Sequence, residues 1–245
     1  MITSKDNDIY KQLCKLFSKK GRDKSGLYVL EGAKFVNDAS EMGITAEMVV
    51  LTQSNADKIY RTKKTVIMDK RLIDRLSDTV SPQGVIGVYR KNSYQAEEFV
   101  CMNRILCLDG VQNSENVGAL IRCAVCAGYE GVLLINACAD YYSPKAVRAC
   151  VGSIMKIKIL NTDIQMLTRL KSEGFKVIGA DVNGSETACL DYTKQVLIIG
   201  SEANGISIEA EKLCDELVRI PIYGKCESLN AAVAGGILMY KSVGY

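Results

Sequence analysis

Residues 104–127 read RILCLDGVQNSENVGALIRCAVCA, and this stretch holds the unit from which the fold is predicted. Its first part, Ile105 to Leu108, is fully apolar, as expected of a strand that is buried on both faces. A polar loop follows, and small and apolar residues then predict a helix from about Val117 to Ala127. A strand, a loop and a helix in this order are typical of an α/β protein.

The same alternation of apolar strands and helices continues to the end of the chain. Strands are expected at 131–135, 157–160, 176–180, 196–199 and 217–220, and helices at 144–150, 164–172, 208–214 and 229–243. Continuous apolar strands separated by helices predict a parallel sheet with both faces covered. The expected fold class is therefore α/β.

The first ninety residues have shorter strands between their helices, which predicts a second, smaller α/β unit. Strands are expected at 27–30, 48–51, 66–68 and 85–89, with helices at 5–20, 35–39, 54–60 and 70–76. A polar run then interrupts the pattern. We therefore predict an N-terminal domain at 1–92, a linker at 93–103 and a C-terminal domain at 104–245.

The composition is ordinary for a globular protein, with 48% hydrophobic and 24% charged residues among 245. No apolar run approaches the roughly 18 residues of a membrane span, and the polar N-terminus has no secretory signal. We therefore expect no membrane partner and a cytoplasmic location. The net charge is +3, and basic clusters at 19–24 and 61–64 put the excess in the N-terminal part. Either cluster alone could be solvated surface, but together they favour this part for phosphate contact.

Ten cysteines and no histidine constrain the chemistry. The cysteines lie in apolar segments and are expected to be reduced core residues. Cys123 and Cys126 form one C-x-x-C, but without a second pair or a histidine we expect no metal site. The absence of histidine also removes the usual general base. Any proton transfer must therefore use another residue or the substrate.

Three loops follow predicted strand ends, where ligands bind in a parallel sheet. In the first loop, Asn116 and Gly118 come before or within the first turn of a helix, and Arg122 follows. Asn116 could cap this helix. Arg122 is a charge in an apolar, cysteine-rich segment, so it needs a carboxylate of the protein or a phosphate from outside.

The second loop runs from Gly200 to Gly205, and its two glycines permit close backbone approach. Glu202 is a carboxylate held at the end of an apolar strand. The loop has neither the G-x-G-x-x-G pattern nor the G-K-[ST] of a phosphate loop, so we do not expect dinucleotide or nucleoside triphosphate binding.

The third loop begins at Ile220 and Pro221 and ends at Ser228, Leu229 and Asn230, which open a helix of small residues. Ser228 is the expected N-cap of that helix. The alanines and glycines behind it would let the helix pack very close to another backbone. A polar helix start beside an apolar strand end can hold a small ligand.

In this order and spacing, the three loops resemble the motifs of the SpoU (TrmH-like) branch of SPOUT RNA methyltransferases. That pattern reads approximately N-x-G-x-x-x-R, then G-x-E-x-x-G, then I-P followed by S-L-N. Its fixed letters are all present, as Asn116, Gly118, Arg122, Gly200, Glu202, Gly205, Ile220, Pro221, Ser228, Leu229 and Asn230. Residues 26–34 also look like the family's accessory substrate-binding domain of the L30e type. The chain departs from common family residues at Asn113, Ser114, Cys150 and Ala232, which concerns substrate choice more than activity.

The resemblance implies a fold: a SPOUT domain with a parallel sheet and a deep trefoil knot, an exception to the rule against knots, preceded by an L30e-like domain. It implies an enzyme that transfers the methyl group of S-adenosyl-L-methionine to a ribose 2′-hydroxyl of RNA, acting as a homodimer through the SPOUT domain. The expected RNA is 23S ribosomal RNA, ahead of transfer RNA. The implied cofactor-binding residues are Leu197, Gly200, Gly205, Ile220, Pro221 and Leu229.

The resemblance also implies that Arg122 is the key catalytic residue. Because a guanidinium is very hard to deprotonate, we expect Arg122 to clamp a phosphate and stabilise the developing alkoxide. That phosphate or a water molecule would take the proton. The remaining catalytic residues, Asn116, Glu202, Ser228 and Asn230, would orient Arg122 and the ribose.

Two other functions stay open at this point. A knotted RNA-binding protein without catalysis would be free to lose Asn116, Arg122, Glu202 and Asn230, which are all retained. A methyltransferase for a substrate other than RNA would need neither the basic N-terminal part nor an L30e-like domain. Both features therefore favour an RNA methyltransferase.

Overall fold

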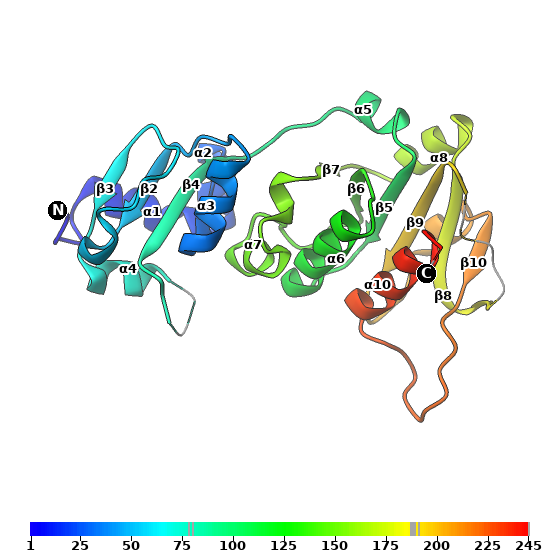
Figure 1. The fold of residues 1–245 in the computed structure, drawn as a ribbon. Coiled ribbons are helices and arrows are strands. Elements are labelled where there is room, and N and C mark those ends of the chain that lie inside the picture. The colour runs from blue at the N-terminus through cyan, green and yellow to red at the C-terminus, as the bar shows by residue number, and fades with distance from the viewer. Residues whose placement is uncertain (78, 80, 187–189, 191, 245) are drawn as a thin grey trace. The chain divides into compact units, whose positions relative to one another are not determined.

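The structure is a computed structural model, and it describes residues 1–77, 79, 81–186, 190 and 192–244. The chain forms two compact units, whose elements are labelled in Figure 1. The first unit comprises Met1–Asn92 and Asp140–Gly152, and the second comprises Ser93–Ala139 and Ser153–Tyr245. The segment Asp140–Gly152 thus packs with the N-terminal residues, although in sequence it lies between two strands of the second unit.

The second unit is built on a six-stranded sheet in the order β10-β8-β9-β5-β6-β7. Its strand pairs are parallel, as the continuous apolar strands predicted. The strands are β5 (Arg104–Asp109), β6 (Gly131–Ile135), β7 (Lys158–Asn161), β8 (Lys176–Ser185), β9 (Gln195–Gly200) and β10 (Glu216–Val218). The strands β6 and β9 are buried along their whole length because helices cover both faces.

Helices lie on both faces of this sheet (Figure 1). They are α5 (Ala96–Val100), α6 (Ser114–Cys126), α8 (Gln165–Ser172), α9 (Ile208–Glu211) and α10 (Ala231–Lys241), with a 3₁₀ turn at Ser153–Met155. Side chains of α5, α8 and α9 pack with Ile105, Cys107 and Ile198 on one face. The helices α6 and α10 pack against each other, and α10 also contacts β9. The helix α5 falls within the polar run at 93–103, and its Phe99 is fully buried.

The close approach of α10 to α6 depends on Gly235. A Cβ atom built on Gly235 would lie 2.3 Å from Cδ2 of Leu120 on α6 and 3.4 Å from Cγ1 of Ile199 on β9. No side chain larger than hydrogen fits there without displacing its neighbours. Gly235 therefore lets α10 pack tightly on side chains of α6 and β9, whereas the sequence predicted close approach to another backbone.

The first unit contains a four-stranded sheet in the order β1-β4-β2-β3. The pair β2/β3 is parallel, and β4 runs antiparallel to both β1 and β2. The strands are β1 (Leu27–Glu31), β2 (Met48–Leu51), β3 (Thr65–Ile67) and β4 (Val85–Arg90). The helices are α1 (Asp8–Leu16), α2 (Lys19–Ser25), α3 (Ala33–Glu41), α4 (Lys70–Leu76) and α7 (Pro144–Cys150), with a 3₁₀ turn at Gln53–Asn55. Side chains of α1 and α4 share one apolar core with the sheet.

Two predicted helix caps were wrong. Asn113, and not Asn116, caps α6, because its Oδ1 accepts hydrogen bonds from the backbone N–H of Glu115 at 2.8 Å and of Asn116 at 3.4 Å. Asn230, and not Ser228, caps α10. Each helix is preceded by several side chains that can accept a backbone N–H, so sequence alone does not select among them. Among the described residues, no helix combines the length and the apolar character needed to cross a bilayer.

Candidate functional site

Side chains from all three polar loops meet in one hydrogen-bonded chain. The amide Nδ2 of Asn230 donates to Oδ1 of Asn116 at 3.1 Å, and Nδ2 of Asn116 donates to Oε1 of Glu202. Asn116 is only 8% exposed, so both of its polar ends need partners within the protein. We call this set the Asn116–Glu202–Asn230 chain. It connects the first turn of α6, the loop after β9 and the start of α10.

The side chain of Asn230 makes hydrogen bonds both to the start of its own helix and to Asn116 on α6. Its Oδ1 accepts hydrogen bonds from the backbone N–H groups of Ala232 at 2.9 Å and Val233 at 3.3 Å. Its Nδ2 is the group that reaches Asn116. The cap of α10 is therefore also the link between α10 and the first turn of α6.

The glycines of the second loop shape the turn that carries Glu202. Ser201 and Gly205 exchange two backbone hydrogen bonds of 2.9 Å each, so the loop closes on itself directly after β9. A Cβ atom built on Gly200 would lie 2.0 Å from the carbonyl carbon of Gly205, and Gly205 has a φ of +66°. Both positions favour glycine, one for space and the other for backbone conformation.

Arg122 lies outside the Asn116–Glu202–Asn230 chain. It is six residues after Asn116, which is about one and two-thirds helical turns, so the two side chains leave α6 in different directions. Asn116 is buried and Arg122 is exposed. No described side chain forms an ion pair with Arg122. Its guanidinium is therefore accessible to an anion from outside the chain.

A cavity of about 110 Å³ lies at the ends of β8 and β10, beside the start of α10. Three residues singled out from the sequence line it: Ile220, Ser228 and Leu229. The strand expected at 217–220 ends earlier, at Val218, so Ile220 and Pro221 both lie beyond it. Pro221 is half-buried and does not line the cavity.

Asp181 also lines this cavity and was missed from the sequence. It follows the predicted strand 176–180 directly, and that position at a strand end was the signal that could have identified it. The observed strand β8 continues to Ser185. A Cβ atom built on Gly205 would lie 3.9 Å from Oδ2 of Asp181, so the second loop runs beside the cavity.

The other sequence-predicted residues lie deeper or in a neighbouring cavity. Leu197 and Gly200 are buried in β9. Both edges of that strand are paired, one with β8 and the other with β5. Glu202 and Gly205 line a larger cavity of about 590 Å³ together with Asp109. The predicted cofactor-binding residues are therefore divided between the two cavities and β9, except Pro221, which lies in neither cavity nor in that strand.

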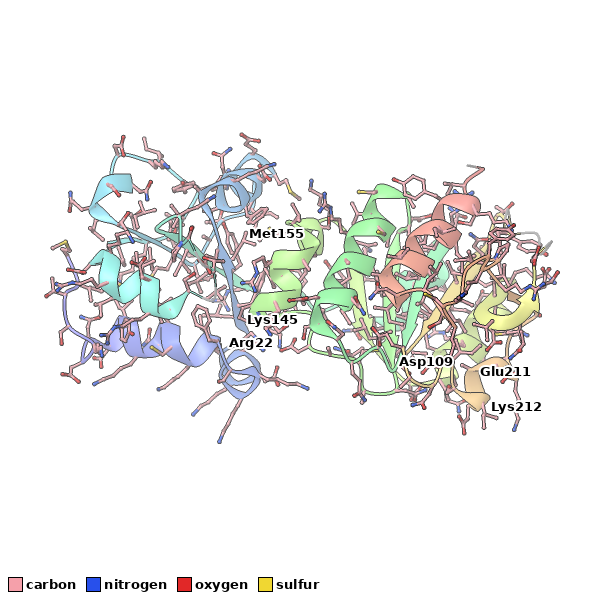
Figure 2. All side chains as sticks on the ribbon, turned by 90° about the horizontal axis from the view of Figure 1, so that it is seen from below. Arg22, Asp109, Lys145, Met155, Glu211 and Lys212 are labelled. Atoms are coloured by element: carbon pink, nitrogen blue, oxygen red, sulfur yellow. The ribbon has the colours of Figure 1, made fainter. Side chains whose placement is uncertain are left out.

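Asp109, at the end of β5, is a further residue that sequence reasoning missed; it is labelled in Figure 2. It is 2% exposed. Its Oδ2 accepts a 2.7 Å hydrogen bond from the backbone N–H of Ser207, and its Oδ1 accepts one of 2.7 Å from Nδ2 of Asn136. Asn136 and Ala137 both have positive φ, of 53° and 57°. Asp109 thus holds the loop after β9 against an unusual turn at the end of β6.

Three thiols of this unit, those of Cys107, Cys138 and Cys214, are poorly suited to nucleophilic chemistry. Burial raises the pKa of Cys138 to about 11 and that of Cys214 to about 12. It also raises the pKa of Cys107, which is fully buried. A thiol with such a pKa is almost fully protonated at neutral pH and does not act as a nucleophile. Within the described residues, no group of three or more His, Cys, Asp or Glu side chains could hold a metal ion.

The chain is similar to known proteins in both sequence and fold. The profile of the SpoU rRNA Methylase family matches residues 103–240, and that of the MRM3-like substrate binding domain matches residues 7–87. The 23S rRNA (guanosine(2553)-2′-O)-methyltransferase RlmP of Bacillus subtilis (strain 168) is 30% identical over 244 residues, covering 98% of this chain and 97% of that protein. The mitochondrial rRNA methyltransferase 3A of Danio rerio is 27% identical over 282 residues, covering 90% of this chain and 64% of that protein. The crystal structure of an AdoMet-bound rRNA methyltransferase from Sinorhizobium meliloti matches with a TM-score of 0.88 and 27% identity, covering 98% of this chain and 96% of that one.

Proposed function

The chain belongs to the SpoU rRNA methylase family, and on this basis we propose that it transfers a methyl group from S-adenosylmethionine to a ribose 2′-hydroxyl of 23S ribosomal RNA. The observation that carries the proposal is the Asn116–Glu202–Asn230 chain, which gathers the three loops beside a cavity. The relative from Bacillus subtilis, similar over nearly all of both chains, is named for 2′-O-methylation of a 23S guanosine. This favours 23S ribosomal RNA over transfer RNA as the substrate.

We assign the two activities of such an enzyme to different parts of the chain. Residues 104–245 perform the methyl transfer, residues 1–92 bind the RNA, and 93–103 connect them. The ranges of the two matching family profiles, 103–240 and 7–87, support this division.

The residues around the smaller cavity fit S-adenosylmethionine. Ile220, Leu229 and Leu238 provide aliphatic walls for the adenine ring, and the carboxylate of Asp181 can accept hydrogen bonds from hydroxyl or ammonium groups. A volume of about 110 Å³ equals only a few water molecules. S-adenosylmethionine is larger than this cavity. It therefore also extends along the loop after β9, where Gly205 leaves room beside Asp181.

When bound, S-adenosylmethionine supplies an electrophilic methyl group on a sulfonium. The side chains of the site hold the ribose so that its 2′-oxygen lies in line with that methyl group, and such alignment removes much of the entropic part of a barrier. The Asn116–Glu202–Asn230 chain fixes the loops that form the walls of the site. Glu202, Ser228 and Asn230 are exposed in these loops, and we assign them to orient the ribose.

Arg122 acts on the RNA phosphate next to the reacting ribose. Its guanidinium is exposed and has no ion-pair partner among the described residues, so it can take two phosphate oxygens at once. Positive charge at this place stabilises the negative charge that develops on the 2′-oxygen as its hydroxyl loses the proton. That oxygen then forms the bond to the methyl carbon while the bond from the methyl carbon to the sulfur breaks, which leaves S-adenosylhomocysteine. The proton of the hydroxyl passes to the phosphate or to a water molecule, because arginine does not release its own proton at physiological pH.

We further propose that the enzyme is a homodimer formed through the second unit. Val233, Ile237 and Tyr240 are 51%, 44% and 40% exposed and lie on one face of α10, at positions i, i+4 and i+7. Three large apolar side chains along one helix face favour burial against a second copy. An Ile237→Asp variant should elute as a monomer where the wild-type protein elutes as a dimer; equal masses by light scattering would reject this interface.

The remaining parts of the proposal follow from family membership. We propose that the C-terminal part forms the trefoil knot typical of the family and that the enzyme works in the cytoplasm, where its RNA substrate would be found. A knotted chain refolds slowly, so refolding of the second unit from denaturant should show a phase far slower than expected for its size.

The test compares ribosomal and transfer RNA from cells with and without the protein. Mapping of 2′-O-methyl groups should show one ribose in 23S ribosomal RNA that is methylated only when the protein is present. Calorimetry with S-adenosylmethionine separates the enzyme from a non-catalytic RNA-binding protein, which would not bind the cofactor. A missing methyl group in transfer RNA alone would assign the other substrate.

A further inference from the structure

A cavity of about 670 Å³ opens in the first unit between α1, α2 and the four-stranded sheet. We call it the α1–α2 cavity. Its volume lies within the roughly 300–1,000 Å³ of typical ligand sites. All of its lining residues belong to the segment 12–88, so the first unit forms it without help from the second.

The floor of the α1–α2 cavity is aliphatic. Leu13, Leu16 and Val88 are almost fully buried, and Leu27 and Met48 are half-buried. Leu13 and Leu16 come from the inner face of α1, and the other three come from β1, β2 and β4. Such a floor can hold a flat, weakly polar ring that leaves water on binding.

The rim of the same cavity is basic. Lys15 lies in the last turn of α1, and Lys20 and Lys24 are four residues apart on one face of α2. None of the three forms an ion pair with any described residue, and no acidic side chain lines the cavity. Like charges at this spacing disfavour a helix by about 0.2–0.5 kcal/mol per pair. An anion at the rim would remove that repulsion.

The arginine of α2 has a different role from the three lysines of the rim. Arg22, labelled in Figure 2, is 3% exposed and turned into the first unit. Its Nη2 donates to Oδ2 of Asp140 at 2.7 Å and its Nη1 to the carbonyl oxygen of Leu16 at 2.8 Å. Arg22 therefore fixes α2 against the end of α1, and the lysines remain for a ligand.

We propose that the α1–α2 cavity receives one unstacked nucleotide of the substrate RNA, with its base on the aliphatic floor and its phosphates against Lys15, Lys20 and Lys24. This inference rests on the proposed function, because it takes RNA as the substrate. A splayed-out base is the usual element by which proteins recognise single-stranded RNA. The cavity would thus hold the RNA by a nucleotide other than the one that is methylated.

The test measures binding of unmodified 23S ribosomal RNA, transcribed in vitro, to the full-length protein. A triple variant carries Lys15→Ala, Lys20→Ala and Lys24→Ala. Its matched control carries Lys5→Ala, Lys19→Ala and Lys58→Ala, which remove the same charge from exposed lysines outside the cavity. Equal melting curves would show that both variants are folded.

Three lost phosphate contacts at about 0.1 M salt should weaken RNA binding by about 10- to 100-fold and lower the slope of log Kd against log salt concentration by about 2. In methyl-transfer assays the KM for RNA should rise by the same factor, while kcat and the affinity for S-adenosylmethionine stay unchanged. The control variant should stay within about twofold of the wild-type protein. Equal weakening in both variants, or none in either, would overturn the proposal.

Two further measurements separate the possible occupants. RNA that contains 4-thiouridine should cross-link to peptides holding Leu27 or Met48 in the wild-type protein and not in the cavity variant. Adenosine 5′-monophosphate is the second probe, because tight binding of it together with unchanged RNA affinity in the variant would assign the cavity to a free nucleotide and overturn the RNA assignment. A wild-type protein that binds RNA through these lysines but transfers no methyl group would uphold the cavity and reject the proposed function.

Discussion

Replacing Gly235 by alanine tests how closely α10 must approach α6. The new Cβ atom would lie 2.3 Å from Cδ2 of Leu120, and Leu120 is fully buried and cannot turn away freely. The next residue, Gly236, is a matched control in the same helix. A Cβ atom there would lie 3.5 Å from Sγ of Cys123, which is an ordinary contact distance.

The magnitude follows from comparing the two variants. Both exchange glycine for alanine inside a helix, which favours the folded state by about 1 kcal/mol through helix propensity. This gain is common to both variants and cancels in the difference. Overpacking at Gly235 costs about 1–3 kcal/mol. Gly235→Ala should therefore be less stable than Gly236→Ala by about 1–3 kcal/mol, and Gly236→Ala should be more stable than the wild-type protein.

Thermal and urea unfolding of both variants measure this difference. At about 2–4 °C per kcal/mol for a chain of this size, the melting temperature of Gly235→Ala should lie roughly 2–12 °C below that of Gly236→Ala. Because Asn230 caps α10 and contacts Asn116, displacing the helix should also lower kcat. If Gly235→Ala is as stable as Gly236→Ala, the Leu120 side chain has room for a methyl group and the tight contact described above is wrong.

Three further predictions concern the site and its surroundings. Asn116→Asp removes the donor to Glu202 and places a second carboxylate beside it, so it should lower both kcat and the melting temperature more than Asn116→Ala does; equal effects would contradict the Asn116–Glu202–Asn230 chain. Burial raises the pKa of Cys214 to about 12, so at pH 8 about one thiol in 10,000 is ionised there, and iodoacetamide should alkylate the exposed Cys226 first and Cys214 only after unfolding, as peptide mass spectrometry would show. Arg122→Ala should bind S-adenosylmethionine with wild-type affinity in calorimetry, and a large loss of that affinity would place Arg122 in the cofactor site instead.

Four strands of the second unit, β5, β6, β7 and β9, were predicted from the sequence to within one residue at each end. Gly131 to Ile135 was predicted as a strand and is β6, and the apolar run 105–108 extends by one residue at each end in β5. Such strands are buried on both faces, so hydrophobicity alone marks them. The strand β8 continues five residues beyond the predicted end. These residues lack the continuous apolar pattern of a buried strand, and the pairing of Ser185 with Val218 of β10 is a tertiary contact.

Residues at helix starts and strand ends were harder to place. The sequence offers Asn113, Ser114 and Asn116 before or within the first turn of α6, and only the folded loop shows that Asn113 caps while Asn116 reaches Glu202. The role of Asp109 could not be predicted from the sequence for another reason, because its partners Asn136 and Ser207 follow other strands. Long-range contacts of this kind follow from the strand order, which a single sequence does not reveal.

The α1–α2 cavity was only partly foreseen. The basic run 19–24 indicated phosphate contact, but the sequence does not show that Arg22 is buried against Asp140 while Lys20 and Lys24 stay free. Helical spacing places the two lysines on one face, and the aliphatic floor beneath them comes from strands elsewhere in the first unit. The chemistry of the cavity therefore appears only in the folded unit.

The central claim is tested most directly by purified protein, S-adenosylmethionine with a labelled methyl group, and unmodified 23S ribosomal RNA. Label is expected on the 2′-oxygen of one ribose, as nuclease digestion and mass spectrometry would show, and no label is expected when Arg122→Ala replaces the wild-type protein. Label on a base, or wild-type turnover by Arg122→Ala, would contradict it.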